Sequence, residues 1–190
     1  MSGNPWSAYW VEAAVRTTNT GDGHLGEDRL FDARDCYLRA AEYYRLALRG
    51  AEPGTAEHRS WNDAQVSAFR AALPLLPHPA TPFAITVDSR SVVGYLFRSA
   101  VAAHPVTVVC PTVEHLPPES LYHPTAAPIL ELGLNCVVYG VVRGNFSAGR
   151  APEGERDSHR VIDSVADWVL RQPGIDARGI LLAPSNRGTH

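Results

Sequence analysis

The stretch Gly179–His190, which reads Gly-Ile-Leu-Leu-Ala-Pro-Ser-Asn-Arg-Gly-Thr-His, decides the fold that we expect. Branched apolar side chains run directly into a turn of small residues, with Ser185 at its tip. This pattern is typical of a buried parallel strand, and of the sharp strand-to-helix turn that raises a nucleophile above a sheet. We therefore predict a strand at Gly179–Ala183, in a sheet built from the residues that precede it.

The residues upstream supply further strands. Phe83–Val87 and Ser91–Arg98 flank the turn Asp88-Ser89-Arg90, and this arrangement predicts an antiparallel hairpin. Short apolar runs at Val106–Cys110 and Asn135–Tyr139 predict two more strands, both buried.

Helices are expected between these strands. One helical stretch should cover about 117–132, broken into two pieces by Pro124 and Pro128. A second helix, at about Glu155–Gln172, follows the glycine-rich loop Gly140–Gly154. A hairpin followed by alternating strands and helices implies an α/β sheet of about five strands with right-handed crossovers.

The first 80 residues are expected to be helical. Ser7 should cap a short helix, and the Gly/Asp/Asn-rich segment Thr17–Gly26 should form a loop. Apolar residues then recur every three or four positions from Leu30 to Leu48, which predicts the most regular helix of the chain.

A third helix, at about Ala56–Leu73, should complete this segment. The prolines that follow, between residues 74 and 82, change the local composition and predict a boundary. The expected organisation is therefore a helical segment at 1–80 and a sheet domain at 81–190.

Composition narrows the classes of partner. A hydrophobic content of 45% and a charged content of 19% are typical of a globular protein. The net charge of −3 gives no reason to expect a nucleic acid or an anionic membrane as partner. No apolar run approaches about 18 residues, and the N-terminus has no hydrophobic signal core, so we expect a soluble cytoplasmic protein.

Neither the cysteines nor the histidines form a recognisable metal motif. Cys36, Cys110 and Cys136 lie inside predicted apolar elements and are expected to be buried free thiols. The histidines lack short spacings such as HExxH, so we expect no metal and no cofactor. The alternative is a metal site whose ligands would come from His115, His123, Glu114 and Glu119.

Several scaffold phrases together resemble a known family. Residues 33–45, Ala-Arg-Asp-Cys-Tyr-Leu-Arg-Ala-Ala-Glu-Tyr-Tyr-Arg, look like its N-terminal helical segment, and Val93–Arg98 looks like its second strand. Ile175-Asp176, just before the last strand, also fits. The chain resembles, over residues 6–190, the α/β-hydrolase family that includes fermentation-respiration-switch-like proteins, 2,6-dihydropseudooxynicotine hydrolase and fungal polyketide-shortening hydrolases.

This resemblance implies a truncated α/β-hydrolase-like sheet of about five strands with an N-terminal helical segment. It also implies a small organic, polyketide-like molecule as ligand or substrate. The last strand should then lie at or near an open edge of the sheet. Because an uncovered edge promotes aggregation, we expect it to be covered in a homodimer or by a related hydrolase.

The family's catalytic motifs are altered in this chain. Where the family has a Gly-Gly pair that helps to form the oxyanion hole, this chain has Thr112-Val113, and a family Asp matches His115, beside Glu114. The family's nucleophile turn, Gly-x-Ser-x-Gly-Gly, reads Ala183-Pro184-Ser185-Asn186-Arg187-Gly188. Arg187 thus puts a long cation where the sharp turn needs a glycine.

Other residues are candidates for the wall of the pocket. The loop arginines Arg143 and Arg150 would rim it and bind a carboxylate or an enolate in a bidentate manner. The remaining candidates for the oxyanion site or the pocket are Thr112, Val113, Tyr122 and Asn186.

The family's triad acid and histidine come after the nucleophile in sequence. Here Ser185 is followed only by Asn186–His190, and on a helix the side chain of His190 would point roughly 140° away from that of Ser185. We therefore expect a pseudo-hydrolase that binds a small organic metabolite, or acts on it by cyclisation, dehydration or decarboxylation.

Three alternatives stay open. Ser185 could act as the nucleophile of a hydrolase for an ester or C–C bond, with His115 and Glu114 nearby and a base supplied by another subunit. The chain could be a non-catalytic dimer partner of a full-length hydrolase. It could also be a fragment of a longer gene product.

Overall fold

The computed structural model describes residues 4–101, 106–112, 116–142 and 155–183. The chain divides into two units, Met1–Pro77 and His78–His190. This division falls within the proline-rich crossing where the sequence predicts a boundary. The expected organisation into segments 1–80 and 81–190 stays a prediction.

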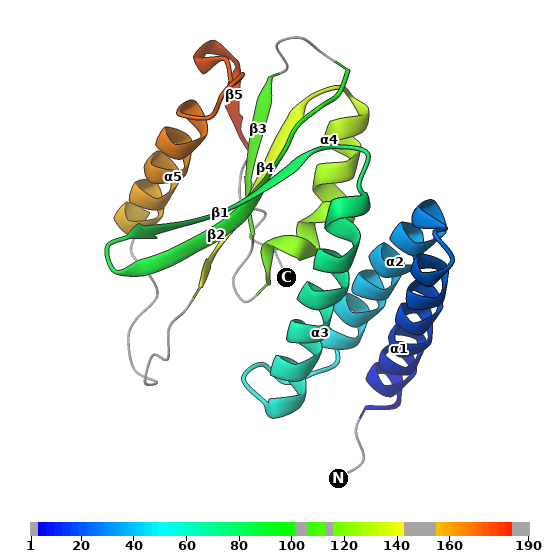
Figure 1. The fold of residues 1–190 in the computed structure, drawn as a ribbon. Coiled ribbons are helices and arrows are strands. Elements are labelled where there is room, and N and C mark those ends of the chain that lie inside the picture. Colours follow the sequence, from blue (N-terminus) through cyan, green and yellow to red (C-terminus); the bar gives the residue numbers. More distant parts are fainter. Residues whose placement is uncertain (1–3, 102–105, 113–115, 143–154, 184–190) are drawn as a thin grey trace. The chain divides into compact units, whose positions relative to one another are not determined.

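The first unit consists of helices (Figure 1). They are α1 (Pro5–Gly26), α2 (Leu30–Leu48) and α3 (Ala56–Ala72), followed by the short 3₁₀ turn η1 (Leu73–Leu75). The bounds of α2 agree with the predicted helix, and its periodic residues are buried from Ala33 to Leu48, whereas Leu30 is exposed. At the start of α3, the Thr55 hydroxyl accepts a hydrogen bond from the N–H of His58.

The sequence prediction for α1 is wrong in two respects. The helix begins one turn earlier than expected, with Asn4 as the cap and Pro5 at its first position, and it continues through Thr17–Gly26 instead of ending in a loop. Ser7 is not a cap: its buried hydroxyl donates to the Ala47 carbonyl at 2.9 Å and so joins α1 to α2.

Packing against α2 explains why the glycine-rich segment is helical. A Cβ atom on Gly21 would lie 3.0 Å from Cε1 of Tyr37 and 3.1 Å from Cβ of Cys36, so the missing side chain allows close approach of the two helices. The Tyr37 hydroxyl also donates to Asp22 at 2.7 Å. These contacts outweigh the weak helix propensity of glycine and aspartate.

The second unit contains a five-stranded mixed sheet. Its strands are β1 (Ala80–Val87), β2 (Arg90–Phe97), β3 (Thr107–Pro111), β4 (Asn135–Val142) and β5 (Ile180–Leu182). They lie in the order β1-β2-β4-β3-β5, with β1/β2 and β2/β4 antiparallel and β3/β4 and β3/β5 parallel. The predicted α/β sheet is therefore confirmed, and β5 lies at one edge of it.

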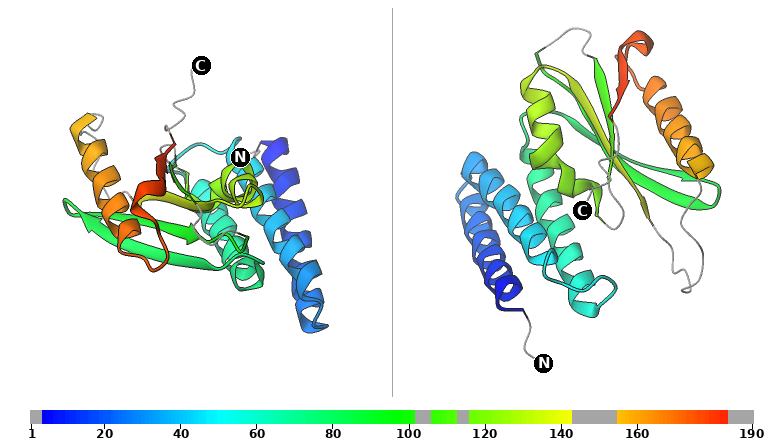
Figure 2. Two further views of the ribbon diagram at one scale, coloured as in Figure 1. Left: turned by 90° about the horizontal axis from the view of Figure 1, so that it is seen from above. Right: turned by 180° about the vertical axis from the view of Figure 1, so that it is seen from behind.

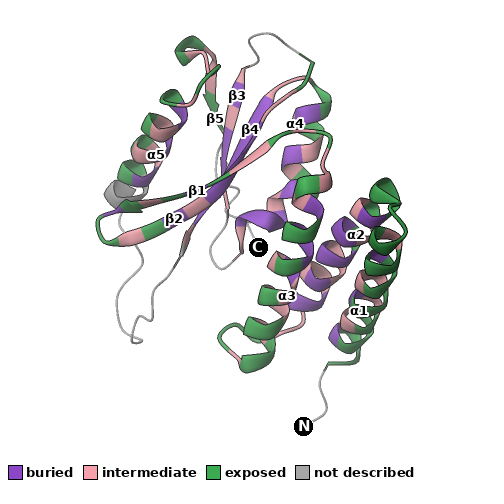
Figure 3. Cartoon of the chain, viewed as in Figure 1, coloured by how far each residue is buried: buried purple, intermediate pink, exposed green. Residues whose placement is uncertain are grey.

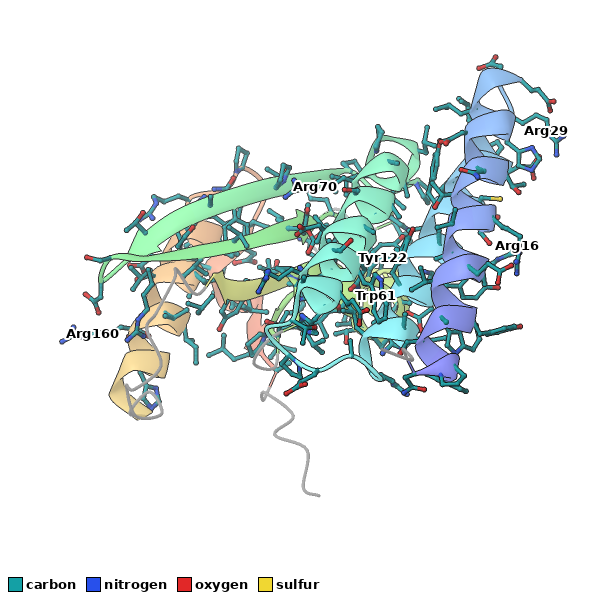
Figure 4. All side chains as sticks on the ribbon, turned by 90° about the horizontal axis from the view of Figure 1, so that it is seen from below. Arg16, Arg29, Trp61, Arg70, Tyr122 and Arg160 are labelled. Carbon is teal, nitrogen blue, oxygen red and sulfur yellow. The ribbon has the colours of Figure 1, made fainter. Side chains whose placement is uncertain are left out.

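The hairpin between β1 and β2 has a two-residue turn. Asp88 and Ser89 have φ values of 48° and 66°, which are typical of the type I′ turn that matches the twist of the flanking strands. The Asp88 carboxylate accepts a hydrogen bond from Arg160 on α5 (Glu155–Leu170) at 3.1 Å. Figure 4 shows the Arg160 side chain extending outward from that helix.

Helical segments cover both faces of the sheet (Figure 2). On one face, the α5 residues Val161, Val165 and Val169 pack in a core with residues from β1 to β4, and Trp168 stacks on Phe83 with ring centroids 4.2 Å apart. The other face carries α4 (Ala127–Glu131) and the short turns that precede it. Figure 3 shows buried residues along β2, β4 and the inner side of α4.

The predicted helix over 117–132 differs in detail. It consists of three segments of different type: the 3₁₀ helix η2 (Pro118–Leu121), the π-helix η3 (Tyr122–Ala126) and α4. Pro124 lies within η3 and Pro128 within α4, so the prolines lie inside these short segments and do not separate two longer pieces. A further 3₁₀ turn, η4 (Ala177–Gly179), leads into β5.

Candidate functional site

The carboxyl ends of three parallel strands meet at one edge of this sheet. Thr112 follows β3, Gly140 lies near the end of β4, and Ala183 follows β5. The N–H of Ala183 donates to the carbonyl of Val109 at 2.9 Å, so the pairing of β5 with β3 continues past the strand. In open α/β sheets, ligands bind beyond the carboxyl ends of the strands. We therefore take this end of the sheet as the candidate site and call it the carboxyl edge, to distinguish it from the lateral edge formed by β5.

Most of the site residues predicted from sequence lie outside the described part of the chain. These residues are Val113, Glu114, His115, Arg143, Arg150, Ser185 and Asn186. Their roles remain predictions, and Thr112 and Tyr122 are the predicted site residues that the structure describes.

Thr112 is held to the neighbouring strand. Its backbone N–H donates to the carbonyl of Tyr139 on β4 at 2.7 Å. Its hydroxyl fills the space beside Gly140, because a Cβ atom on that glycine would lie 2.7 Å from Oγ1 of Thr112. The preceding residue, Pro111, has no N–H. The first backbone donor after β3 is therefore already used within the sheet.

Tyr122 lies at the start of η3 and packs on the sheet. Its side chain is 6% exposed, and its ring centroid lies 5.4 Å from that of Phe97. Figure 4 shows it among the inner side chains. Tyr122 and Phe97 thus form part of the packed aromatic side chains on the face of the sheet that carries α4.

A buried carboxylate lies on this same face. Glu119, on η2, is 8% exposed, and its Oε1 accepts a hydrogen bond from the hydroxyl of Tyr95 at 2.6 Å. Within the described ranges, no ion pair joins Glu119 to an arginine or a histidine. Pro118, its neighbour in sequence, lies 3.6 Å from the position of a Cβ atom on Gly140, so η2 borders β4 at that glycine.

Tyr95 is a residue that the sequence reasoning missed. It lies on β2 opposite Val138 of β4 and is 4% exposed. A buried tyrosine hydroxyl normally has a hydrogen-bond partner, so a tyrosine in an otherwise apolar strand signals a polar group nearby. The sequence alone does not identify the hydrogen-bond partner of Tyr95, because Glu119 lies 24 positions further along the chain.

Known proteins share this arrangement of strands. No protein-family model matches the chain. The "Hydrolyase poxO" of Penicillium oxalicum is 24% identical over 185 residues, which are 90% of this chain and 43% of that protein. The crystal structure of 2,6-dihydroxy-pseudo-oxynicotine hydrolase matches with a TM-score of 0.73 at 17% identity, over 96% of this chain and 51% of that one. The chain has an α/β-hydrolase fold.

A second solved structure agrees with this assignment. AbyA5 matches with a TM-score of 0.62 and 15% identity, over 95% of this chain and 47% of its own. The chain thus spans about half the length of the α/β-hydrolase-fold proteins it matches. The resemblance expected from the sequence, including a partial sheet with a helical N-terminal segment, is confirmed at the level of the fold.

The cysteines of this α/β-hydrolase fold are free thiols. Cys110 and Cys136 are buried, whereas Cys36 is half-buried rather than buried as expected. A hydrogen bond to Cys110, together with burial, raises the pKa of the Cys136 thiol. Cys136 is therefore a neutral thiol at physiological pH.

Within the described ranges, no group of three or more His, Cys, Asp and Glu residues is placed to hold a metal ion. Of the alternative metal set, Glu114 and His115 lie outside these ranges. None of the described helices combines the length and the apolar character needed to cross a membrane.

Proposed function

We propose that the chain binds a small organic, polyketide-like metabolite at the carboxyl edge of its parallel strands, or acts on it, without serine-hydrolase chemistry. The reactions we favour are cyclisation, dehydration and decarboxylation, because none of them requires an acyl-enzyme at Ser185. Thr112, Tyr122, Arg143 and Arg150 would contribute to the pocket, together with Val113, Glu114, His115 and Asn186.

The hydrogen bond from the N–H of Thr112 to Tyr139 carries this proposal. Acyl transfer needs backbone donors that are free to bind a developing oxyanion, and the loss of one such donor costs about 10²–10³ in kcat. Here the first N–H after β3 is engaged within the sheet, and the residue before it is a proline. This arrangement argues against hydrolysis.

The altered nucleophile turn adds support. Arg187 stands two positions after Ser185, where the Gly-x-Ser-x-Gly pattern has glycine. The names of the similar proteins, a hydrolyase and a hydrolase of a pseudo-oxynicotine, favour a small organic molecule as the ligand class.

A fluorophosphonate probe tests the proposal directly, because it labels only activated serine nucleophiles. We expect no labelling of the wild type, and no difference between the wild type and Ser185→Ala. Labelling that disappears in Ser185→Ala would instead establish a serine hydrolase, with a base supplied from elsewhere in the assembly.

The β5 edge favours a second candidate function, that of an interaction partner. Among the strands of the described residues, β5 pairs only with β3, and Leu181 and Leu182 are 57% and 56% exposed. An apolar strand at a sheet edge is a template for pairing with another chain. We infer that a second copy of this chain, or a related hydrolase, covers this edge.

A further inference from the structure

The lateral edge formed by β5 has a defined set of outward-facing backbone groups. In an extended strand, the N–H and C=O groups of one residue point to one side, and those of the next residue point to the other. The N–H of Ala183 donates to Val109 of β3, so Ala183 and Leu181 face β3. Ile180 and Leu182 therefore direct their backbone groups away from β3. Among the described residues, no strand pairs with β5 on that outward side.

These outward groups are placed symmetrically about Leu181. When two identical strands pair antiparallel around a two-fold axis at Leu181, Ile180 of each copy lies opposite Leu182 of the other. Each such pair is a hydrogen-bonded pair, in which the two residues exchange both N–H···O bonds. Every outward N–H and C=O of Ile180 and Leu182 thereby obtains a partner. The contact is isologous, because both copies use the same patch.

The side chains of β5 also match a second copy. Successive side chains of a strand point to opposite faces of the sheet. Ile180 packs against the core that includes α5, so Leu182 points to that same face and would contact Ile180 of the second copy. Leu181 points to the other face and would lie against its own symmetry mate. Both leucines are exposed in the single chain, and this pairing would cover apolar surface of each.

Within the described residues, no charge on this edge opposes the pairing. Ile180–Leu182 contains neither a charged residue nor a proline, which are common means of protecting an edge strand. Arg178, which precedes the strand, is exposed, and its Nε lies 3.7 Å from the carboxylate of Asp176. In the antiparallel pair, the two Arg178 residues would lie at opposite ends of the paired strands, separated by more than the Debye length of about 10 Å at 0.1 M salt.

We propose that two copies of this chain pair antiparallel through β5, with Leu181 on the two-fold axis, so that one sheet continues across the dimer. This inference rests on the second candidate function, since it names the partner and the register for the same lateral edge. A second copy is the occupant because the outward groups are self-complementary and the strand is uncharged. A parallel strand from a related hydrolase would use the same groups but would leave the purified chain monomeric.

Oxidation of single cysteine variants tests the register. Leu181→Cys places two thiols in a non-hydrogen-bonded pair, whose Cα atoms lie about 4.5 Å apart and within disulfide range. Leu182→Cys is the matched control, because its two copies would be diagonal neighbours, about 7–8 Å apart and beyond that range. After treatment with diamide at micromolar protein concentration, non-reducing electrophoresis should show at least about tenfold more covalent dimer for Leu181→Cys than for Leu182→Cys. The wild type, with its three native cysteines, gives the background.

A double variant separates strand pairing from random collision. Adding Leu182→Lys to Leu181→Cys places a charge opposite Ile180 of the second copy and should remove the cross-link. Three results would overturn the register: equal cross-linking of Leu181→Cys and Leu182→Cys, no cross-link in Leu181→Cys although the wild type sediments as a dimer, or a cross-link that persists in the double variant. A monomeric wild type would overturn the inference together with the second candidate function, whereas fluorophosphonate labelling of Ser185 tests the first candidate function independently.

Discussion

The backbone N–H of Thr112 lies 2.7 Å from the carbonyl oxygen of Tyr139, so the pairing of β3 with β4 extends one residue beyond the end of β3. The Thr112 hydroxyl occupies the space where Gly140 lacks a side chain. The two residues are therefore packed as a unit at the edge where we place the ligand.

The first prediction concerns this pair. Gly140→Ala places a methyl group 2.7 Å from Oγ1 of Thr112, and overpacking of this kind typically costs about 1–3 kcal/mol. Thr112→Ala removes the hydroxyl and should recover part of that loss in the double variant. Urea unfolding of both single variants and the double variant gives the coupling, which we expect to exceed about 0.5 kcal/mol. Strict additivity would show that the contact is unimportant.

A second glycine should be more sensitive. A Cβ atom on Gly94 of β2 would lie 2.2 Å from the backbone carbonyl of Val138 and 2.8 Å from the ring of Phe83. Because a backbone carbonyl within a sheet has little freedom to move, Gly94→Ala should cost about 3 kcal/mol or more. Gly179→Ala is the matched control in the same unit, since its nearest atoms would lie at 3.5 Å. Equal stability of the two variants in thermal unfolding would contradict this packing.

The third prediction concerns alkaline pH. Burial, with a smaller contribution from Cys110, raises the pKa of Tyr139 to about 12, whereas a free tyrosine titrates near 10. The folded state therefore favours the neutral phenol. This stabilisation is complete below about pH 10 and is lost as the pH rises towards 12; the shift is equivalent to roughly 2–3 kcal/mol. Tyr139→Phe should lose less stability between pH 9 and 11.5 in urea unfolding, and parallel pH profiles would refute this account.

The fourth prediction concerns the helical unit. Ser7→Ala removes the buried hydrogen bond from α1 to the Ala47 carbonyl of α2 and should destabilise this unit by about 1 kcal/mol. Ser67→Ala, at an exposed position on α3, is the control and should be close to neutral. Chemical unfolding followed by circular dichroism measures both. A Ser7→Ala variant as stable as the control would show that this bond contributes nothing.

The fifth prediction concerns the β5 edge. If this edge pairs with another copy of the chain, the wild type should associate at micromolar concentration, and Leu182→Lys should prevent association by placing a charge on the strand. Leu132→Lys is the matched control, because Leu132 is 76% exposed in the same unit and lies outside the sheet. Sedimentation velocity distinguishes the species. A monomeric wild type would exclude self-pairing.

Local patterns in the sequence were sufficient to predict much of the secondary structure. The three-and-four spacing from Leu30 to Leu48 predicted the bounds of α2 correctly. The two runs that flank the turn at Asp88 predicted the hairpin, although Arg90 belongs to β2 and not to the turn. The helical state of Thr17–Gly26 could not be predicted, because it depends on Gly21 meeting Tyr37 of another helix. A rule based on neighbouring residues in the sequence cannot predict a contact between two helices.

The strand arrangement around the candidate site was predictable only in outline. The strand predicted at Gly179–Ala183 is present as β5 and pairs in parallel with β3, but it spans only Ile180–Leu182, and its leucines are exposed where the pattern predicts a buried strand. The engaged N–H of Thr112 and the bond between Tyr95 and Glu119 both depend on which strands become neighbours. Strand order is a property of the whole sheet, and periodicity within one segment does not reveal it.

The strand order also has a consequence during protein synthesis. β2 and β3 each pair with β4, which is the fourth strand to leave the ribosome. Until Asn135–Val142 has emerged, the inner edge of the hairpin and the side of β3 that faces β4 have no partner. A nascent chain stalled before that point would expose unpaired strand edges, which are a known cause of misassembly and of chaperone dependence.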